Sequence, residues 1–289
     1  MLDWLYPGMT IAACEQASPL DRIDTRVLLM HGLDLLRTQL ITQSDQVLSD
    51  EHLTQISNLF QRRLDGEPVA YIVQEREFFG LRFHVTPDVL IPRPDTELLV
   101  ELAIQHAPVN SSLLDLGTGS GAIAVSVAHQ RPDLTVTALD ISAAALAVAQ
   151  ENAHRHLAPG KLELLQSDWY AAVPNRQFHT IVSNPPYIVA GDSHLQQGDL
   201  RFEPADALTD HADGLTAYRQ LIGAAHLHLQ ANGWILLEHG YDQATAVRAM
   251  LLQAGFEQVQ SWQDLAEIER VSGGRLPLKQ AKADIKNGA

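Results

Sequence analysis

The segment LLDLGTGSGAIAVSVA, residues 113–128, joins a short apolar run to a helix-like run through three glycines. The apolar run is typical of a buried strand, and the small apolar residues after the glycines favour a helix. Gly117, Gly119 and Gly121 permit a tight strand-to-helix turn and let a ligand approach the backbone closely. This order of strand, glycine loop and helix predicts the first unit of a doubly wound α/β sheet.

The rest of the second half of the chain also alternates strand-like and helix-like segments. The strand-like segments are SLLDL (112–116), LTVTALD (134–140), KLELLQ (161–166), HTIVSN (179–184) and WILLEH (234–239), with FEQVQSW (256–262) and ERVSGGRLPL (269–278) as later candidates. Helical or long connecting segments separate them. Such alternation is typical of a mostly parallel, doubly wound sheet with helices on its faces. The sequence therefore predicts an α/β fold.

The first 75 residues have a different pattern. The segment SDEHLTQISNLFQRRLDG (49–66) begins with a polar Ser-Asp pair, which can cap a helix, and carries apolar residues at helical spacing before a glycine. The segment DRIDTRVLLMHGLDLLRTQL (21–40) has a similar apolar stripe. We expect a helical domain over residues 1–75, which can also bind a partner.

Residues 76–95 are expected to connect this helical domain to the sheet. Short β-type runs within them predict a β-hairpin. Asp95 or Thr96 can cap the helix that the following segment TELLVELAIQHA predicts. The sheet domain then occupies residues 96–289.

Composition excludes several classes of protein. Hydrophobic residues make up 46% of the 289 residues, and the net charge of −15 disfavours nucleic acids as partners. A single cysteine, Cys14, excludes a disulfide framework, and the histidines lack metal-ligand spacing, so we expect no metal site. No segment approaches the ~18 apolar residues of a membrane span. The start, MLDWLYPGMT, lacks the features of a signal peptide, so we expect a cytoplasmic protein without a membrane partner.

Asp140 ends the strand that follows the glycine loop. An acid at this place can accept hydrogen bonds from both hydroxyls of a ribose. Together with Asp140, the loop Gly117-Thr118-Gly119-Ser120-Gly121 indicates a ligand that contains adenosine. The alternative is a tight packing turn followed by the helix-capping sequence Asp140-Ile141-Ser142.

The charge near the loop favours a cationic ligand over a dinucleotide. Asp115 adds negative charge where we expect a diphosphate to approach, whereas S-adenosylmethionine carries a sulfonium and an ammonium group. The third strand is followed by Asp168 and Trp169. Asp168 can accept the amino hydrogens of adenine, and Trp169 can lie against the ring, with core packing as the alternative for Trp169. We therefore expect S-adenosylmethionine as the cofactor.

The fourth strand stops at Asn184-Pro185-Pro186-Tyr187, which carries more chemistry than a turn requires. Strands one and four are expected to be neighbours where the winding of the sheet reverses, so this segment would lie beside the cofactor methyl group. The side-chain oxygen of Asn184 and the carbonyl of Pro185 can each accept one N–H of a planar NH2 group. The prolines hold that carbonyl rigidly, and Tyr187 offers a flat face. A plain rigid loop is the alternative.

Taken together, the motifs resemble those of the protein-(glutamine-N5) methyltransferases of peptide chain release factors, the HemK or PrmC family. The resemblance covers residues 60–275 and rests on GEPVAYIVQEREFFG, LIPRPDTE, DLGTGSGAIA, LDISAAAL, SDWY, NPPYI, EPADAL, DGLTAY and LEHGYDQ. The NPPY motif is shared with other amino-group methyltransferases. The hairpin with LIPRPDTE, and the EPADAL segment, indicate this family in particular.

The resemblance implies a seven-stranded sheet whose last strand is antiparallel. It implies methyl transfer to the glutamine of the Gly-Gly-Gln loop of release factors, with S-adenosylhomocysteine as product. It places Gly117 to Gly121 on the cofactor, Asp140 on the ribose, Trp169 near adenine and Asn184 to Tyr187 on the glutamine amide. Glu203 belongs to a long segment after NPPY that we expect to shape the substrate mouth.

Two departures from the family pattern occur. Asp95 stands where many members have Glu, and the C-terminal segment lacks the usual glycine after Asp264-Leu265-Ala266. That segment also continues into a basic, polar tail, which we expect to be disordered.

Three other functions compete with this interpretation. A DNA adenine-N6 methyltransferase shares the NPPY chemistry, but a net charge of −15 disfavours it. A nicotinamide oxidoreductase would use the glycine loop but not NPPY. A non-enzymatic adaptor would not need Asp140 and NPPY together. We expect a monomeric enzyme acting on release factors.

Overall fold

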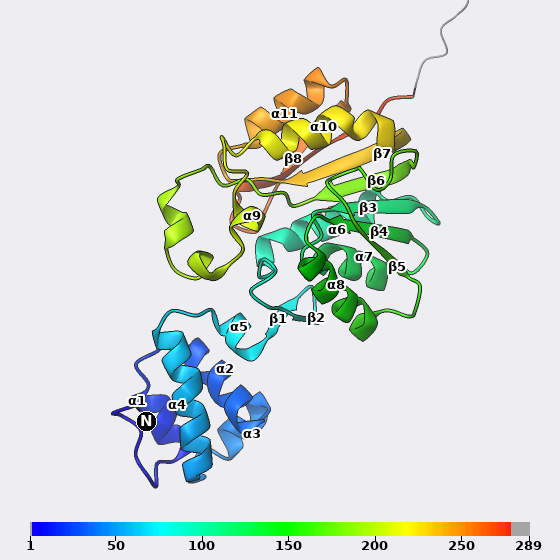
Figure 1. Ribbon diagram of the computed structural model, residues 1–289. Helices are drawn as coiled ribbons and strands as arrows, with labels where there is room; N and C mark the ends of the chain where they lie inside the picture. Colours follow the sequence, from blue (N-terminus) through cyan, green and yellow to red (C-terminus); the bar gives the residue numbers. More distant parts are fainter. Residues whose placement is uncertain (1, 279–289) are drawn as a thin grey trace, which may run out of the picture.

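A seven-stranded sheet forms the body of the computed structural model, which describes residues 2–278 (Figure 1). The strand order is β5-β4-β3-β6-β7-β9-β8, and β9 alone runs antiparallel to its neighbours. The strands are β3 (Ser112–Leu116), β4 (Thr135–Asp140), β5 (Leu162–Gln166), β6 (Phe178–Ser183), β7 (Leu229–Glu238), β8 (Glu257–Gln263) and β9 (Glu269–Arg275). The predicted α/β fold, with seven strands and an antiparallel last strand, is confirmed.

Helices cover both faces of the sheet because side chains along each strand alternate between two cores. Leu113 and Val136 face the core that contains α6 and α7, whereas Leu114 and Leu139 face the core that contains α10 and α11. The helices are α6 (Glu97–His106), α7 (Ala122–Gln130), α8 (Ala143–His156), α10 (Thr216–His228) and α11 (Ala244–Gln253). The sheet is therefore buried on both faces, as its continuous apolar strands predict.

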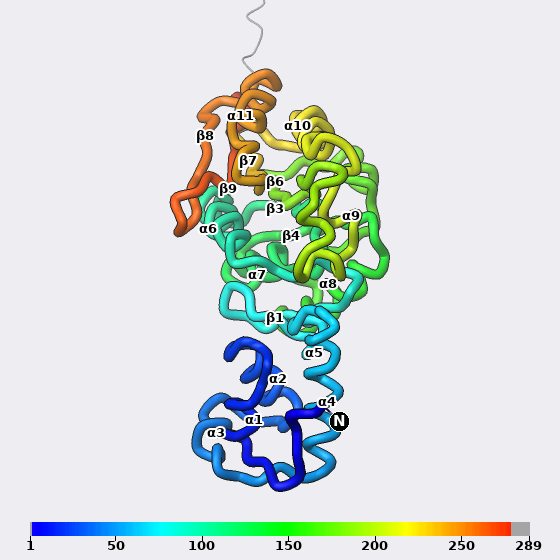
Figure 2. The backbone as a smooth tube through the Cα atoms, turned by 90° about the vertical axis from the view of Figure 1, so that its left-hand side faces the viewer, coloured from blue at the N-terminus to red at the C-terminus, as the bar shows by residue number. Residues whose placement is uncertain are grey.

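The N-terminal helices have a core of their own, which lies apart from the sheet (Figures 1 and 2). They are α1 (Ile11–Ala17), α2 (Arg22–Leu33), α3 (Arg37–Thr42), α4 (Asp50–Leu64) and α5 (Val69–Val73). Helix α4 begins as its sequence predicts, because the hydroxyl of Ser49 accepts a hydrogen bond from the backbone N–H of His52 at 3.1 Å.

A β-hairpin joins these helices to the sheet. It consists of β1 (Glu75–Phe78) and β2 (Leu81–His84), and the rings of Phe78 and Phe83 are buried in the same core as α6 and α7. The side chain of Asn152 in α8 fixes the end of the hairpin: its Oδ1 accepts from the His84 N–H at 2.7 Å, and its Nδ2 donates to the His84 carbonyl at 2.9 Å. The predicted hairpin is therefore present and docked on the sheet layer.

The start of α6 differs from the expectation. A short 3₁₀ turn, η1 (Pro94–Thr96), precedes the helix, and the side chain of Thr96 occupies the N-cap position without making a capping hydrogen bond. The predicted cap by Thr96 is wrong in this respect, because its hydroxyl accepts a hydrogen bond from Asn184 instead. Glu97, the first helical residue, accepts from the backbone N–H of Phe79 at 2.8 Å and so ties the helix to the hairpin.

The turn between β8 and β9 shows how the chain accommodates Glu267, the residue that follows residues 264–266. Glu267 stands where a glycine is usual, and it adopts φ +62°, a conformation that favours glycine. Asp264 compensates, because its Oδ1 accepts from the N–H groups of Ala266 and Ile268 at 2.8 and 3.0 Å. The expectation of a disordered tail falls mainly on residues 279–289, which lie outside the described residues.

Gly121 has a packing role that alanine cannot fill. It precedes α7 with φ +81°, and a Cβ there would lie 3.1 Å from the Cβ of Ala149 in α8. We expect Gly121→Ala to lower the free energy of unfolding by about 2–4 kcal/mol, through backbone strain and overpacking together. Gly160 is the matched control, because it has φ +79° and no atom within 4 Å of an added Cβ. Urea unfolding should show a loss of only about 1 kcal/mol for Gly160→Ala, and equal losses would contradict this role.

Within residues 2–278, no helix combines the length and the apolar character that crossing a lipid bilayer demands.

Candidate active site

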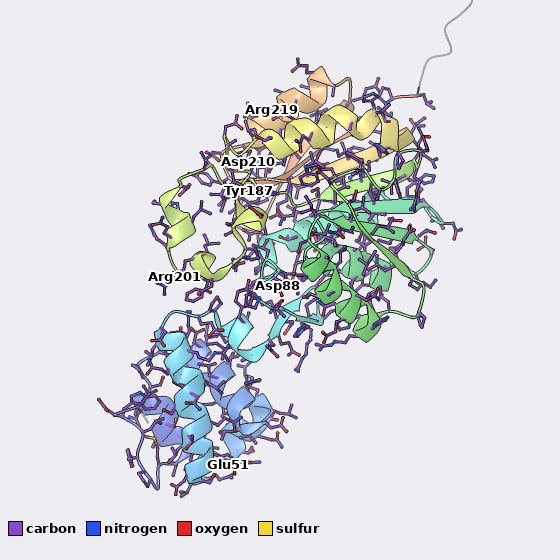
Figure 3. The ribbon with its side chains drawn as sticks, viewed as in Figure 1. Glu51, Asp88, Tyr187, Arg201, Asp210 and Arg219 are labelled. Atoms are coloured by element: carbon purple, nitrogen blue, oxygen red, sulfur yellow. The ribbon has the colours of Figure 1, made fainter. Side chains whose placement is uncertain are left out.

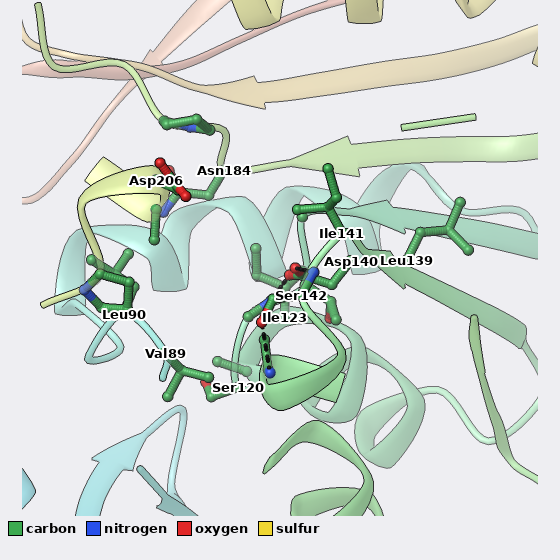
Figure 4. Close-up of a pocket in the computed structure, with 18 of the residues that line it drawn as sticks. Val89, Leu90, Ser120, Ile123, Leu139, Asp140, Ile141, Ser142, Asn184 and Asp206 are labelled. Atoms are coloured by element: carbon green, nitrogen blue, oxygen red, sulfur yellow. Dashed lines mark hydrogen bonds between the residues drawn. The ribbon is translucent and has the colours of Figure 1, made fainter. Parts of the chain in front are cut away.

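A cavity of about 310 Å³ lies at the carboxyl ends of β3, β4 and β6, where the winding of the sheet reverses (Figure 4). Its position follows from the topology, because β3 pairs with β4 on one side and with β6 on the other. The predicted residues that line it are Gly117, Thr118, Gly119, Ser120, Asp140, Asp168, Trp169, Asn184 and Pro186. Sequence-distant motifs therefore meet at one edge of the sheet.

The glycine loop and Asp140 form one hydrogen-bonded unit. The Oδ2 atom of Asp140 accepts from the N–H of Gly119 at 2.8 Å, and its Oδ1 atom accepts from the N–H of Ser142 at 2.9 Å. Burial of this carboxylate raises its pKa, while these backbone N–H groups oppose the rise. The proposed ligand role and the helix-start role of Asp140-Ile141-Ser142 are thus compatible, because Ser142 also caps α8 by accepting from Ala145 N–H at 3.1 Å.

The glycines of the loop have different surroundings. A Cβ at Gly119 would meet no atom within 4 Å, so the backbone there is open to a ligand. Gly121 does not line the cavity and packs against α8. Its expected place among the cofactor-binding residues is therefore not supported by its position, since the chain needs its glycine for helix packing.

The expected position of Asp115 is wrong. Its carboxylate is fully buried beneath the loop, does not line the cavity, and accepts from the hydroxyl of Thr118 at 2.7 Å. Burial raises its pKa to about 7, which weakens its negative charge at neutral pH. The acidic character of the cavity comes instead from four lining aspartates, against one lining basic residue, Arg93. The lining aspartates are Asp88, Asp140, Asp168 and Asp206.

This acidic lining suits a cation better than a phosphate. Arg93 cannot offer its full charge to an anion, because it is ion-paired with the buried carboxylate of Glu203. A sulfonium or ammonium group would gain attraction from the aspartates, whereas a diphosphate would be repelled. The cavity therefore fits the expected S-adenosylmethionine.

The side chain of Trp169 lies between the cavity and the core. It adopts φ +44°, and its ring lies beside Gly117, where an added Cβ would be 3.7 Å from the ring. The ring also packs against the core under α10 and α11. Trp169 therefore forms part of the cavity wall and of the core, while its contact with adenine stays a prediction.

A second hollow, of about 190 Å³, adjoins the first at Asn184. Asn184, Pro185 and Tyr187 line the second hollow, whereas Pro186 faces the first. The hydroxyl of Ser183 donates to the Leu116 carbonyl at 2.6 Å and so fixes the end of β6 against β3.

The backbone and the ring of Tyr187 are both held in place. Its carbonyl accepts from the side-chain Nε2 of Gln243 at 3.0 Å, which anchors the segment after the prolines. Burial raises the pKa of its phenol well above the usual range, so the ring stays neutral. The NPPY segment is therefore a rigid wall between two cavities.

Glu203 lines neither hollow, so its position does not support the expected direct contact with the substrate. Its carboxylate is fully buried, accepts from the Ile91 N–H at 3.0 Å, and pairs with the Arg93 guanidinium. It thereby joins the segment after NPPY to the segment after the hairpin. Its neighbour Pro204, together with Asp206 and Ala207, does line the cavity. Glu203 therefore shapes the mouth indirectly.

Glu203→Ala should destabilise the fold, because it removes a buried partner of Arg93 and leaves the Ile91 N–H unpaired. We expect a loss of about 3 kcal/mol in the free energy of unfolding. Asp199→Ala is the control, since it breaks the more exposed pair between Arg63 and Asp199 and should cost no more than about 1 kcal/mol. Urea unfolding of both variants measures the difference, and similar losses would contradict the assigned role.

Three residues of the site could not be identified from the sequence alone. Arg93 lines both hollows, Thr96 lines the first, and Glu238 is buried behind Asn184 with a raised pKa. The motifs LIPRPDTE and LEHGYDQ contain all three. Their presence in those motifs marks them as candidates. Their roles become apparent only in the structure, where the sheet brings them close to Asn184.

Two protein-family models match the chain, "Methyltransferase small domain" over residues 94–208 and "PrmC N-terminal domain" over residues 10–73. The chain is 55% identical over 275 residues to a Burkholderia pseudomallei protein named release factor glutamine methyltransferase, covering 93% of this chain and 96% of that protein.

Solved structures share the fold. A methyltransferase from Pyrococcus furiosus is 18% identical, with a TM-score of 0.54, covering 77% of this chain and all of that one. A 16S rRNA N2 G1207 methyltransferase from T. thermophilus, solved with AdoMet and guanosine, is 22% identical with a TM-score of 0.50. That match covers 70% of this chain and 49% of the other.

Proposed function

Because this chain belongs to the release factor glutamine methyltransferases, we propose that its two adjoining hollows hold the cofactor and the substrate glutamine of that reaction. The chain is an S-adenosylmethionine-dependent protein-glutamine methyltransferase. The specific substrate residue in this proposal is the glutamine of the Gly-Gly-Gln loop of release factors, and the methyl group goes to its side-chain nitrogen, N5. The observation that carries the assignment is that Asn184 lines both hollows.

The cofactor side is assigned to the first hollow. Gly117 and Gly119 offer backbone without obstructing Cβ atoms, and Asp140 offers carboxylate oxygens for two ribose hydroxyls. Asp168 and Trp169 would hold the adenine end. When bound, S-adenosylmethionine supplies an electrophilic methyl group on a positively charged sulfur.

The substrate side is assigned to the NPPY segment. An amide nitrogen is a poor nucleophile because its lone pair is delocalised into the carbonyl group. The Asn184 side-chain oxygen and the Pro185 carbonyl would accept the two N–H groups, orient the nitrogen and stabilise positive charge as it forms. The amide nitrogen would take the methyl group and then lose one N–H proton to solvent, and the cofactor would leave as a neutral thioether. Tyr187 would pack against the planar amide.

The helical domain at residues 1–75 is proposed to hold the body of the release factor, with residues 76–95 as the connector to the catalytic domain at 96–289. Its position beside the substrate mouth supports this role. Arg63 of α4 pairs with Asp199 at 3.0 Å. Arg201 (labelled in Figure 3) donates to the carbonyl of Asp65, the residue after α4, at 3.3 Å. These contacts join α4 to the segment that follows NPPY.

The remaining proposals concern the oligomeric state, the cellular location and the binding of nucleic acid. We propose a monomer that acts in the cytoplasm, where translation termination takes place, and that does not bind nucleic acid directly. The net charge of −15 supports the last point, because it disfavours contact with phosphates.

A transfer assay tests this function. The protein is incubated with methyl-labelled S-adenosylmethionine and either a purified release factor or duplex DNA. We expect label on the release factor alone, and none on a release factor whose Gly-Gly-Gln glutamine is replaced by asparagine. Label on DNA would favour the adenine-N6 alternative, and label on the asparagine variant would contradict the glutamine assignment.

A further inference from the structure

Glu238 lies directly behind the proposed catalytic asparagine. It ends β7, the strand that pairs in parallel with β6, and the register sets Leu237 opposite Ser183. The next residues along these two strands, Glu238 and Asn184, are therefore side by side. Glu238 is 2% exposed and lines neither hollow. A carboxylate buried at this place needs an explanation, because burial of a charge is costly.

The side chains of Thr96 and Asn184 are joined by a hydrogen bond, and both influence the carboxylate of Glu238 behind them. The Nδ2 atom of Asn184 donates to the hydroxyl oxygen of Thr96 at 3.3 Å. Burial raises the pKa of Glu238, and the polar side chains of Thr96 and Asn184 oppose that rise because they favour the ionised carboxylate. Its Oε2 atom has no partner among the described residues, so part of the carboxylate remains unsatisfied.

The ionised carboxylate sets the direction of these hydrogen bonds. A carboxylate only accepts, so the hydroxyl proton of Thr96 points to Glu238 and its oxygen is left to accept from Asn184. The Nδ2 end of the Asn184 amide is then fixed on the side of Thr96 and Glu238. Its Oδ1 end must point the opposite way, toward the hollows.

We propose that Glu238, acting through Thr96, is the positioning residue that holds the Asn184 amide with its oxygen toward the substrate. This inference rests on the proposed function, because a substrate NH2 group needs an acceptor there. A flipped Asn184 would present its own NH2 group to the NH2 of the substrate, and two donors cannot bond. A protonated Glu238 could donate a hydrogen bond and so stabilise that flipped amide.

Because this positioning needs an ionised Glu238, the rate of methyl transfer should depend on pH. Its pKa is raised to about 7, chiefly by burial; the nearby carboxylate of Asp95 adds to this rise, and the guanidinium of Arg270 opposes it. Burial raises the pKa of the Tyr187 and Tyr218 phenols, and the negative charge of nearby Glu238 adds to the rise. Activity should therefore rise with pH through about 7 as Glu238 loses its proton.

The test compares variants of the full chain under single-turnover conditions with a release factor between about pH 6 and 9. Glu238→Gln keeps the size of the side chain but cannot become an anion. We expect its methyl-transfer rate to fall by about tenfold or more and its rise with pH through 7 to disappear. The Kd for S-adenosylmethionine should change by less than about twofold, since Glu238 does not line that hollow.

Three further variants sharpen the test. Thr96→Val removes the hydroxyl that connects Glu238 to Asn184 and should slow transfer, whereas Thr96→Ser restores the hydroxyl and should recover most of the rate. Glu101→Gln is the matched control, because Glu101 is an exposed carboxylate on α6, and its pH profile should match that of the unmodified chain.

Thermal unfolding separates positioning from a structural role. The pKa of Glu238 is raised on folding, so its contribution to stability is fully present below about pH 4.5 and is lost as the pH rises through about 7. Glu238→Gln should therefore have a Tm at alkaline pH at least equal to that of the unmodified chain. A lower Tm together with weaker cofactor binding would overturn the proposal in favour of a structural role.

An unchanged rate and pH profile for Glu238→Gln would also overturn the positioning role while leaving the proposed function intact. Failure of the unmodified chain to methylate the release factor at any pH would overturn the proposed function itself, and this inference with it.

Discussion

Asn184→Ala is expected to slow methyl transfer to a release factor by about 100- to 1000-fold, more than any other single substitution at the site. The variant lacks the side-chain oxygen that accepts one amide N–H, so the nitrogen loses both its orientation and the acceptor for its developing charge. The loss should appear in kcat rather than in the KM for the release factor, because this interaction strengthens as the bond forms. Single-turnover kinetics with labelled cofactor measures it.

Cofactor binding is the control for this variant. Asn184 is one of many residues around the first hollow, so calorimetry should find the Kd for S-adenosylmethionine within about fivefold of the unmodified value. Asn175→Ala serves as a matched substitution, because Asn175 is exposed between β5 and β6 and should leave both quantities unchanged. Normal turnover by Asn184→Ala would remove the basis of the proposed mechanism.

Asp140→Ala should weaken S-adenosylmethionine binding by about 100-fold. The carboxylate would accept from two ribose hydroxyls, and each charged hydrogen bond is worth about 1.5–3 kcal/mol. Part of the loss would come from the loop, because Asp140 also holds the N–H groups of Gly119 and Ser142. Isothermal titration calorimetry gives the change in Kd directly.

Asp140→Asn separates the two contributions to cofactor binding. It keeps one side-chain oxygen for the backbone but loses the charge and one acceptor for the ribose. An intermediate Kd with an unchanged Tm would assign the loss to the ribose contacts. A Kd for Asp140→Ala equal to that of the unmodified chain would rule out the ribose assignment altogether.

The strands were predictable because each is a short apolar run that ends at a polar residue. SLLDL coincides with β3, and HTIVSN differs from β6 by one residue at each end. The glycine loop and the NPPY segment could also be predicted as site residues, because both follow such strands directly. In a parallel sheet the carboxyl ends lie at one edge, so position along a strand is enough to bring these motifs together.

Side-chain partners were not predictable in the same way. Thr96 and Glu238 reach Asn184 only because β7 lies next to β6 and α6 begins above both strands, which the local sequence does not encode. Thr96 has the pattern of a helix cap, yet tertiary contacts give its hydroxyl another partner.

The glycine loop also shows that local sequence does not predict the role of each residue, even between close neighbours. Gly119 and Gly121 are two residues apart and equally permissive, yet the first faces the cavity and the second packs against α8. Asp115 likewise lies one strand residue before the end of β3, and its side chain points beneath the loop rather than into the cavity. The direction of a side chain thus decides its role, and it depends on the neighbouring elements.

The central claim is that the two hollows meet at Asn184 to methylate a glutamine side chain, and mapping the methyl group tests it most directly. A release factor is incubated with the protein and S-adenosylmethionine, digested, and sequenced by mass spectrometry. We predict a single added methyl group, on the side chain of the Gly-Gly-Gln glutamine, and none when Asn184→Ala replaces the unmodified chain. A methyl group on any other residue, or equal modification by Asn184→Ala, would contradict the account.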